Sequence, residues 1–199
     1  IMNKPTVLST GEWLLPIAVW ASRQSELNRV DAERYSNVFV TTDEGQSFSL
    51  LGRADVPNRT FDEHMIIERK DGSLWMLVRL DNGLGQSFSY DRGKTWVDAG
   101  HAGIKGPNSR FFIRRLQSGR LLLVNYDDFP EKEAYEFTDR INLTAKLSDD
   151  EGQTWTGKLV LDSRSEVSYP DGVQADNGMI YIIYDHERYD AKEILMAVF

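Results

Sequence analysis

The sequence predicts an all-β protein with the β-propeller fold, in which short four-stranded sheets repeat around a central axis. A glycine turn followed by a short apolar strand occurs four times, and a second turn motif falls three times between these copies. Aromatic residues make up 11% of the chain, with five Trp, and aromatic side chains suit pleated sheets. Repeats of roughly 40–60 residues built from several short strands are typical of propellers.

The first motif is a turn that contains glycine and leads into an apolar strand. Its glycine supplies the positive φ that a tight hairpin turn requires. The apolar run that follows is typical of a buried strand. The copies are Ser9–Leu15, Lys70–Met76, Gln117–Leu123 and Asp176–Ile182. We therefore expect about four sheets within the 199 residues.

The second motif has the pattern Ser/Thr-x-Asp-x-Gly-x-Ser/Thr-aromatic, and its copies are Thr41–Phe48, Ser89–Trp96 and Ser148–Trp155. We expect each aspartate to accept hydrogen bonds from turn amides and from the Ser/Thr hydroxyls, as in Asx-turns. The glycine takes the left-handed conformation, and the aromatic ring folds back into the core of its own sheet. A calcium loop is the alternative, but each copy offers too few oxygen ligands at EF-hand spacing.

Composition excludes several classes of function. The formal net charge is −8 and no cluster of Lys and Arg is present, so we expect no nucleic-acid partner. The absence of Cys removes disulfides, thiol catalysis and Cys-ligated zinc. The three histidines, His64, His101 and His186, show no ligand spacing, and we expect no metal and no cofactor. No apolar run reaches the ~18–20 residues of a membrane span.

The three Asp-containing octets resemble the Asp-boxes of the sialidase (neuraminidase) superfamily, which are also called BNR repeats. The resemblance implies a six-bladed propeller, of which residues 1–199 are expected to form one incomplete domain of about four blades, the early ones missing. It implies a scaffold role for Asp43, Asp91 and Asp150. It also favours a secreted or periplasmic protein. Either the missing blades or a second copy is expected to close the ring, because an open ring exposes sheet edges.

Three segments resemble the active-site motifs of exo-sialidases. In the first, Glu63 precedes a glycine turn, Arg79 and an Asp-box in the order that sialidases use. The resemblance implies that Glu63 activates the nucleophile and that Arg79 binds the substrate carboxylate. Arg140, ahead of the third octet, takes the place of another carboxylate-binding arginine. Tyr169, within Ser168–Gly172, takes the place of the tyrosine nucleophile.

The sequence departs from the family pattern at three points. His64 stands where sialidases usually have a small residue, and Arg110 adds an arginine at the inner end of a blade. Both features resemble a subfamily of predicted neuraminidases and other glycoside hydrolases, and we assign His64 to the catalytic group and Arg110 to substrate binding. The family's first arginine and its acid/base aspartate belong to the early blades that this chain is expected to lack.

Each assignment has a structural alternative. In the structural interpretation, Glu63 is a surface carboxylate and Arg79 forms a salt bridge between blades. Arg140 then pairs with Asp139 or Asp149. Tyr169 is a core aromatic and His64 a buried, hydrogen-bonded histidine. Asp171 is interpreted as a turn former. Asp185 and Arg188 either reach the rim of the pocket or form a solvated pair, which is the commoner arrangement.

The expected function is that of an exo-acting glycoside hydrolase that cleaves a terminal, acidic sugar from glycans. A glycan is thus the expected substrate and partner. Two alternatives stay open. One is a propeller that binds glycans or a protein without catalysis. The other is a different carbohydrate-active enzyme, such as another glycosidase or a lyase, that uses His64 and Tyr169 as acid and base.

Overall fold

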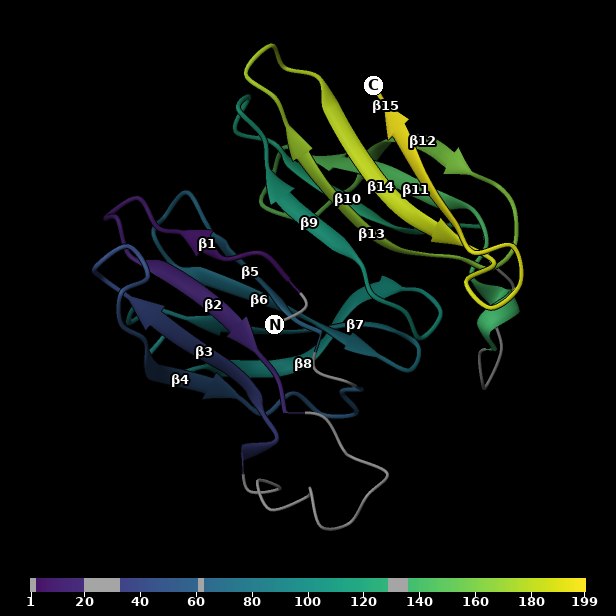
Figure 1. Cartoon of the computed structure of the whole chain (residues 1–199). Helices are drawn as coiled ribbons and strands as arrows, with labels where there is room; N and C mark the ends of the chain where they lie inside the picture. The colour runs from purple at the N-terminus through teal and green to yellow at the C-terminus, as the bar shows by residue number, and fades with distance from the viewer. Residues whose placement is uncertain (1–2, 20–32, 61–62, 129–135) are drawn as a thin grey trace. The chain divides into compact units, whose positions relative to one another are not determined.

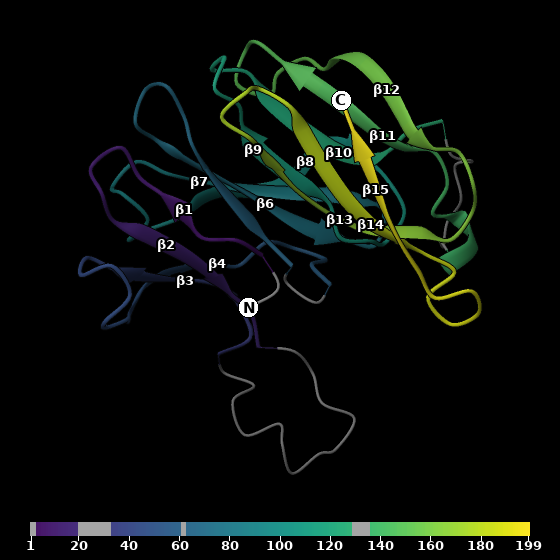
Figure 2. The same cartoon turned by 45° about the horizontal axis from the view of Figure 1, so that its top comes forward.

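The computed structural model describes residues 3–19, 33–60, 63–128 and 136–199, and this part of the chain contains four antiparallel sheets (Figures 1 and 2). Neighbours in sequence are neighbours in each sheet, so every sheet is a simple meander. We call the sheets blades 1 to 4. Blade 1 contains β1 (Thr6–Val7), β2 (Trp13–Ile17), β3 (Ser36–Thr41) and β4 (Ser49–Ala54). Blade 2 contains β5 (Met65–Glu68), β6 (Leu74–Leu80), β7 (Gly83–Ser89) and β8 (Val97–Lys105).

Blade 3 contains β9 (Phe112–Arg115), β10 (Leu121–Tyr126), β11 (Leu143–Ser148) and β12 (Thr156–Asp162). Blade 4 has three strands, β13 (Val167–Gln174), β14 (Ile180–His186) and β15 (Glu193–Val198). A short 3-10 helix, η3 (Phe137–Asp139), precedes β11. The all-β propeller class and the content of about four blades predicted from the sequence are confirmed.

The two central strands of a blade are more buried than its outer strand. All seven residues of β6 and all six of β10 are buried, as their apolar sequences require. The outer strand β8, by contrast, alternates between exposed and half-buried residues. The four glycine turns that precede β2, β6, β10 and β14 all have a positive φ, at Gly11, Gly72, Gly119 and Gly178. The hairpin turns predicted there are therefore confirmed.

The chain divides into two compact units. Unit 1 comprises Ile1–Leu80 and Leu84–Ile104, and unit 2 comprises Asp81–Gly83 and Lys105–Phe199. Unit 1 carries blades 1 and 2, whereas unit 2 carries blades 3 and 4. The prediction that residues 1–199 belong to a single domain stays a prediction.

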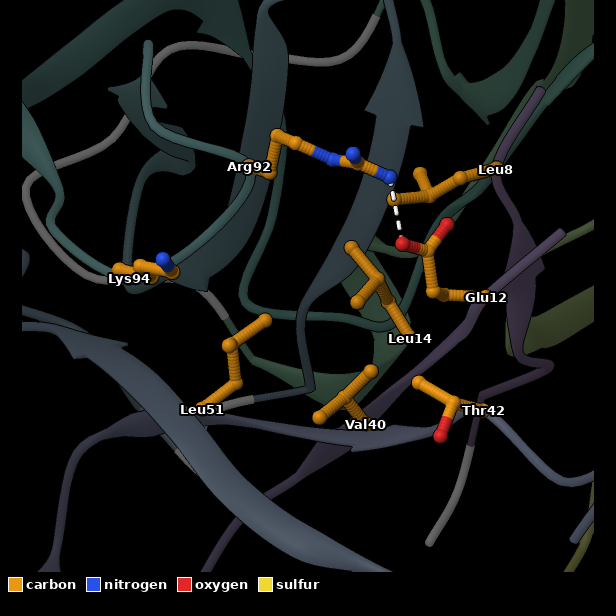
Figure 3. A pocket seen from close by; sticks show the side chains of 8 residues that line it. All are labelled: Leu8, Glu12, Leu14, Val40, Thr42, Leu51, Arg92 and Lys94. Carbon is orange, nitrogen blue, oxygen red and sulfur yellow. Dashed lines mark hydrogen bonds and ion pairs between the residues drawn. The ribbon is translucent and has the colours of Figure 1, made fainter. Parts of the chain in front are cut away.

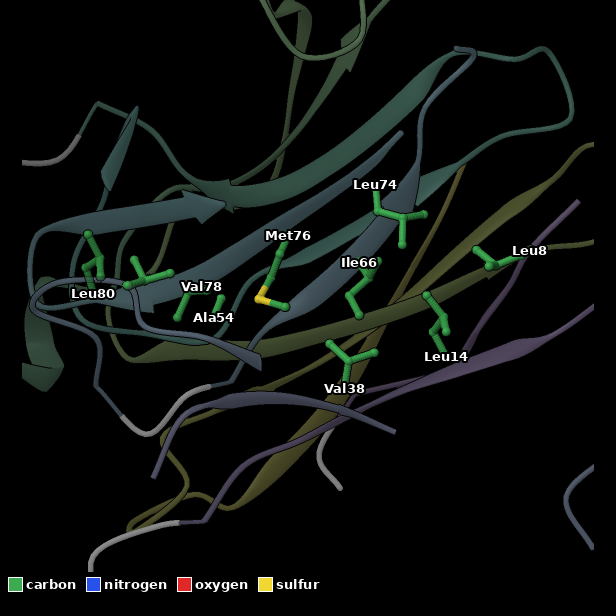
Figure 4. Close-up of a cluster of buried hydrophobic side chains, with 10 residues drawn as sticks. Leu8, Leu14, Val38, Ala54, Ile66, Leu74, Met76, Val78 and Leu80 are labelled. Atoms are coloured by element: carbon green, nitrogen blue, oxygen red, sulfur yellow. The ribbon is translucent and has the colours of Figure 1, made fainter. Parts of the chain in front are cut away.

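The core of unit 1 is one cluster of aliphatic side chains to which both blades contribute (Figure 4). Blade 1 supplies Leu14 and Val38, and blade 2 supplies Ile66, Leu74 and Met76, all of them at most 2% exposed. Burial of each such side chain contributes roughly 1.5–3 kcal/mol. The two blades are therefore held together chiefly by the hydrophobic effect.

The predicted aspartate turns form three equivalent corners, at Thr41–Phe48, Ser89–Trp96 and Ser148–Trp155, which we call the aspartate corners. At Asp91, the Ser89 hydroxyl and the Thr95 amide both donate to Oδ1, at 2.9 Å each, and the Thr95 hydroxyl donates to Oδ2 at 2.6 Å. The same three hydrogen bonds recur at Asp43 and at Asp150. The hydrogen bonds predicted from the motif are confirmed.

The aromatic residue that ends each corner does not behave uniformly. Trp96 packs against the core cluster of unit 1, with its Nε1 donating to the Gly93 carbonyl at 3.0 Å. Phe48 is 53% exposed, so the prediction that it folds into the core of its own blade is wrong. Its ring lies over its own turn instead, 3.6 Å from where a Cβ on Gly45 would stand. The corner itself is held by polar hydrogen bonds, whereas its aromatic residue is half-buried at Trp96 and Trp155 and exposed at Phe48.

The hydrogen bonds also set the ionisation of the corners. The hydroxyl of the last Ser or Thr is the largest cause, and it lowers the pKa of Asp43, Asp91 and Asp150 from 3.8 to about 2. The unfolded pKa of an aspartate is about 3.9. The stabilisation from each corner is therefore present above about pH 4 and is lost as the pH falls towards 2.

We expect Asp91→Asn to lower the Tm by roughly 2–4 °C at pH 6, because the charge-assisted hydrogen bonds are lost. Its Tm should also fall less between pH 5 and pH 2 than that of the unmodified chain, since one of the depressed pKa values is gone. Thermal unfolding followed by circular dichroism measures both. Asp98→Asn, at an exposed position in β8, is the control and should leave the curve unchanged. Parallel Tm curves for Asp91→Asn and the unmodified chain would contradict this reading.

One glycine allows the corner of blade 2 to lie directly on blade 1. A Cβ on Gly52, in β4, would stand 2.2 Å from the Gly93 carbonyl oxygen and 2.6 Å from that of Lys94. Neither backbone oxygen can move without distorting the aspartate corner around Asp91. Only glycine therefore fits at this position.

Gly52→Ala should destabilise the chain by roughly 1–3 kcal/mol, because the added methyl overpacks this contact. Urea denaturation gives the free energy of unfolding. Gly100→Ala is the matched control, since a Cβ on Gly100 in β8 meets nothing within 4 Å. If both variants unfold at the same urea concentration, the close packing of β4 on the corner is refuted.

Candidate functional site

Glu63 and Arg79 form a buried ion pair in unit 1. Arg79 lies near the end of β6, and Glu63 stands just before the neighbouring strand β5. Arg79 Nη1 donates to Glu63 Oε2 at 2.7 Å, and the side chains are 4% and 0% exposed. Two charges removed from water cost several kcal/mol, which a close, hydrogen-bonded pair offsets. Removing either partner would leave the other charge buried without this ion pair.

His64 lies beside this pair but is tied to the backbone. Its Nε2 lies 2.8 Å from the Asn37 carbonyl oxygen, so this nitrogen carries the proton and donates. The His64 carbonyl in turn accepts a hydrogen bond from Asn3 Nδ2 at 2.7 Å. The side chain is 1% exposed. His64 thus links the segment before β5 to β3, and its catalytic role stays a prediction.

Tyr169 occupies an irregular point in β13 of unit 2. The pairing of β13 with β14 shifts between Ser168 and Asp171, so the strand bulges at this residue. Tyr169 has φ +56°, a left-handed conformation that is strained for a bulky side chain. Its side chain is half-buried. Strain of this kind persists only where surrounding contacts enforce it, and it concentrates at functional sites.

Arg110 supplies one of these contacts. Its Nη1 donates to the Pro170 carbonyl at 2.7 Å, and its Nη2 lies 3.6 Å from Asp171 Oδ2. The side chain is buried and comes from the segment just before β9. Arg110 therefore holds the bulge directly after Tyr169. Asp171, interpreted from the sequence as a turn former, lies within β13 and accepts a hydrogen bond from the Gly172 amide.

Arg140 also contacts the segment that carries Tyr169. Its Nη2 donates to the Asn108 carbonyl at 2.8 Å, and its guanidinium stacks 4.5 Å from the Phe137 ring centre. Its own carbonyl accepts a hydrogen bond from the Val167 amide in β13. The Asp139 carboxylate accepts a hydrogen bond from the Glu136 amide, and Asp149 pairs with Arg120.

From the sequence, Arg188 and Asp185 are expected either at the rim of the pocket or in a solvated pair. In the structure, the Arg188 guanidinium lies over the Tyr169 ring at 4.1 Å from its centre, and 5.4 Å from the Phe137 ring. It also pairs with Asp185. Burial lowers the pKa of Arg188, but the Asp185 carboxylate and the Tyr169 hydroxyl outweigh this and raise it above its usual value. The Asp-x-x-Arg spacing was the only sequence signal for this pair.

Unit 2 therefore brings three of the predicted residues, Tyr169, Arg110 and Arg140, into one constellation and adds Arg188. Unit 1 holds the other three, Glu63, His64 and Arg79. Within the described residues, no group of three or more His, Cys, Asp and Glu is placed to bind a metal ion. No helix in the same part of the chain is long and apolar enough to cross a membrane.

A cavity of about 240 Å³ lies elsewhere in unit 1, at the aspartate corner of blade 2 (Figure 3). Leu8, Leu14, Val40 and Leu51 form its apolar walls, and Arg92 with its partner Glu12 lies at its edge. It contains none of the predicted site residues. Its apolar walls come from blade 1, and Arg92 and Lys94 come from the aspartate corner of blade 2.

The family comparison matches a known domain. The model of the BNR repeat-like domain matches residues 1–182. The chain belongs to the BNR repeat-like domain family. The resemblance drawn from the aspartate octets is therefore confirmed at the level of the family. No curated protein matches the chain.

Solved structures show the same propeller fold as this BNR repeat-like chain. A protein of unknown function from Dyadobacter fermentans has a TM-score of 0.69 at 18% identity, over 98% of this chain and 51% of that one. A Hadza microbial sialidase has a TM-score of 0.65 at 18% identity, and the match covers 90% of this chain and 34% of the sialidase chain. The α-L-arabinanase of Penicillium chrysogenum, complexed with arabinobiose, has a TM-score of 0.64 at 14% identity, and the match covers 98% of this chain and 60% of the arabinanase chain. At these identities the likeness concerns the fold alone, and the chain spans about a third to three fifths of each relative.

Proposed function

We propose that this BNR repeat-like chain is part of an exo-acting glycoside hydrolase that removes a terminal acidic sugar from glycans. The observation that carries the proposal is the constellation in unit 2. A tyrosine in a strained backbone conformation lies beneath one guanidinium, and two further arginines hold the adjacent backbone. Guanidinium groups are the side chains that bind a substrate carboxylate best, and two of these three are already paired with the carboxylates of Asp171 and Asp185.

The residue types fit the chemistry of a sugar with a carboxylate on its anomeric carbon. A carboxylate nucleophile would meet like-charge repulsion there, whereas a neutral tyrosine hydroxyl does not. Sialidases are the recognised glycosidases with a tyrosine nucleophile. The retaining reaction would form a bond between the Tyr169 oxygen and the anomeric carbon as the glycosidic bond breaks, and water would then release the sugar.

The remaining roles follow the sialidase resemblance. Glu63 would accept the tyrosine proton, and Arg79 and Arg140 would bind the substrate carboxylate. The bond from Glu63 to Arg79 would fix the orientation of both side chains. Arg110 is proposed to contribute positive charge to the site while it holds the Pro170 carbonyl.

The lyase alternative depends on His64 as an acid or base. The hydrogen bond from its Nε2 to the Asn37 carbonyl and its burial favour a structural role over proton transfer. A neutral substrate is the more serious alternative, since one of the similar structures is an arabinanase.

We also propose that a further blade of the same kind covers blade 4. One face of this blade exposes a row of apolar side chains from its three strands: Val173, Ile183, Ile194, Met196 and Val198. The chain, moreover, spans only 51% of the Dyadobacter fermentans protein. An exposed apolar sheet face of this kind ordinarily packs against another element.

The activity is tested on aryl glycosides of sialic acids, uronic acids and arabinose. We expect release from the acidic glycosides, and Tyr169→Phe should lower kcat by roughly 10³-fold or more because the nucleophile is lost. Tyr189→Phe is the matched control, since this ring belongs to the same aromatic cluster but is 74% exposed.

Activity confined to the arabinosides would overturn the acidic substrate. Activity that survives in Tyr169→Phe would overturn the tyrosine nucleophile. Binding of acidic sugars without turnover would instead indicate a glycan-binding propeller.

A further inference from the structure

The contact between Arg188 and Tyr169 is fixed by the pairing of two strands. Ser168 in β13 faces Asp185 in β14, and the Ser168 hydroxyl donates to Asp185 Oδ1 at 2.7 Å. Tyr169 follows Ser168, and Arg188 follows the end of β14 by two residues. The register of these strands therefore brings a guanidinium and a tyrosine ring together from segments that are 19 residues apart in the sequence.

Arg188 is held on several sides. Its Nη2 donates to the Ser168 hydroxyl at 3.1 Å and to the Asp185 carboxylate. The turn that carries it is closed by backbone hydrogen bonds from the Asp190 and Lys192 amides to the Glu187 carbonyl, at 3.0 and 2.8 Å. Its side chain is 26% exposed and that of Asp185 is 15% exposed. A solvated pair would be far more exposed, and a long side chain loses conformational freedom when it is held in this way.

We propose that Arg188 is a positioning residue for the nucleophile Tyr169, and that its guanidinium stabilises the negative charge on the tyrosine oxygen during glycosyl transfer. The proposal rests on the proposed function. A guanidinium stays charged throughout the reaction and attracts the face of an aromatic ring. The attraction grows when the ring carries the charge of a phenolate, because the guanidinium 4.1 Å from the ring centre then faces a full negative charge.

Arg188 gains and loses no proton in the glycosyl transfer. Tyr169 gives its hydroxyl proton to a general base, its oxygen bonds to the anomeric carbon, and the leaving oxygen takes the bonding pair and a proton from a general acid. Water then attacks the same carbon and gives a proton to the deprotonated general acid, the tyrosine oxygen leaves with the bonding pair, and the general base returns its proton to that oxygen. Negative charge develops on the tyrosine oxygen as its proton leaves in the first half-reaction, and again as the oxygen departs from the anomeric carbon in the second, and Arg188 stabilises this charge in both.

Asp185 weakens the stabilisation that Arg188 gives to the tyrosine oxygen, but it also orients the guanidinium. Its carboxylate neutralises part of the guanidinium charge, but it binds Nη2 on the side of Ser168 and so holds the guanidinium plane over the ring. Arg188 thus acts through Tyr169, whereas Arg140 stacks on Phe137.

The test compares Arg188→Gln and Arg188→Lys with Arg164→Gln in the full chain. Arg164 is the matched control, because it also pairs with a carboxylate near its own hairpin, that of Asp162, but is 48% exposed and stacks on no aromatic ring among the described residues. The first readout needs no glycosidase activity. N-acetylimidazole acetylates the tyrosine oxygen, and peptide mass spectrometry gives the rate at Tyr169, with Tyr90 and Tyr189 as internal references.

We expect Arg188→Gln to slow acetylation of Tyr169 about tenfold, Arg188→Lys to slow it less, and Arg164→Gln to leave it unchanged. If Arg188 only covers the ring, its removal exposes the hydroxyl and acetylation becomes faster. An unchanged or faster rate in Arg188→Gln overturns the proposal.

The second readout is kinetic. Arg188→Gln should lower kcat about 10²-fold while KM changes less than about threefold, and lysine should restore part of kcat. A rise in KM with an unchanged kcat would make Arg188 a substrate-binding residue and overturn the positioning role. If the unmodified chain cleaves no acidic glycoside, the proposed function fails, and the acetylation rates still decide the part played by Arg188.

Discussion

The bond from the buried Arg110 guanidinium to the Pro170 carbonyl is the interaction on which the candidate site depends. A buried arginine is stable only where acceptors surround it, and the bulge in β13 provides a backbone carbonyl and the Asp171 carboxylate. In return, the arginine fixes the strand directly after a strained tyrosine. Without this contact, β13 could pair regularly with β14, and a shift of one residue would turn the tyrosine to the other face of the blade.

The scaffold delivers these contacts by local rules. The apolar strand β10 is buried on both faces and pairs with β9. Arg110 stands two residues before β9 begins at Phe112. The aspartate corner around Asp150 closes the hairpin between β11 and β12, and Arg140 stands just before β11. The aspartate corner thus closes its hairpin by its own hydrogen bonds, and the candidate site residues Arg110 and Arg140 lie in the segments just before β9 and β11. The same arrangement in unit 1 places the pair of Glu63 and Arg79 at the start of β5 and the end of β6.

The fold followed from the sequence because its signals are local. Glycine turns and aspartate corners need only a few consecutive residues, and the donors to each aspartate, turn amides and Ser/Thr hydroxyls, follow from the motif. Phe48 was misplaced because burial of a ring depends on a cluster elsewhere in the fold, which the octet does not encode. The close approach at Gly52 and the stacking of Arg188 depend on pairing between distant segments, so neither motif nor composition could reveal them. The residues drawn from the family resemblance divide between the two units, and their roles rest on chemistry that the fold alone does not determine.

The central claim is that Tyr169 forms the covalent bond to an acidic sugar. The most direct measurement uses a sialosyl fluoride that carries a second fluorine beside the anomeric carbon, which slows hydrolysis of the sugar–protein bond. Peptide mass spectrometry of the treated chain then locates the sugar. We expect one sialosyl group on the peptide that contains Tyr169, attached through the tyrosine oxygen. A chain that carries no sugar, or that carries it on any other residue, would contradict the account.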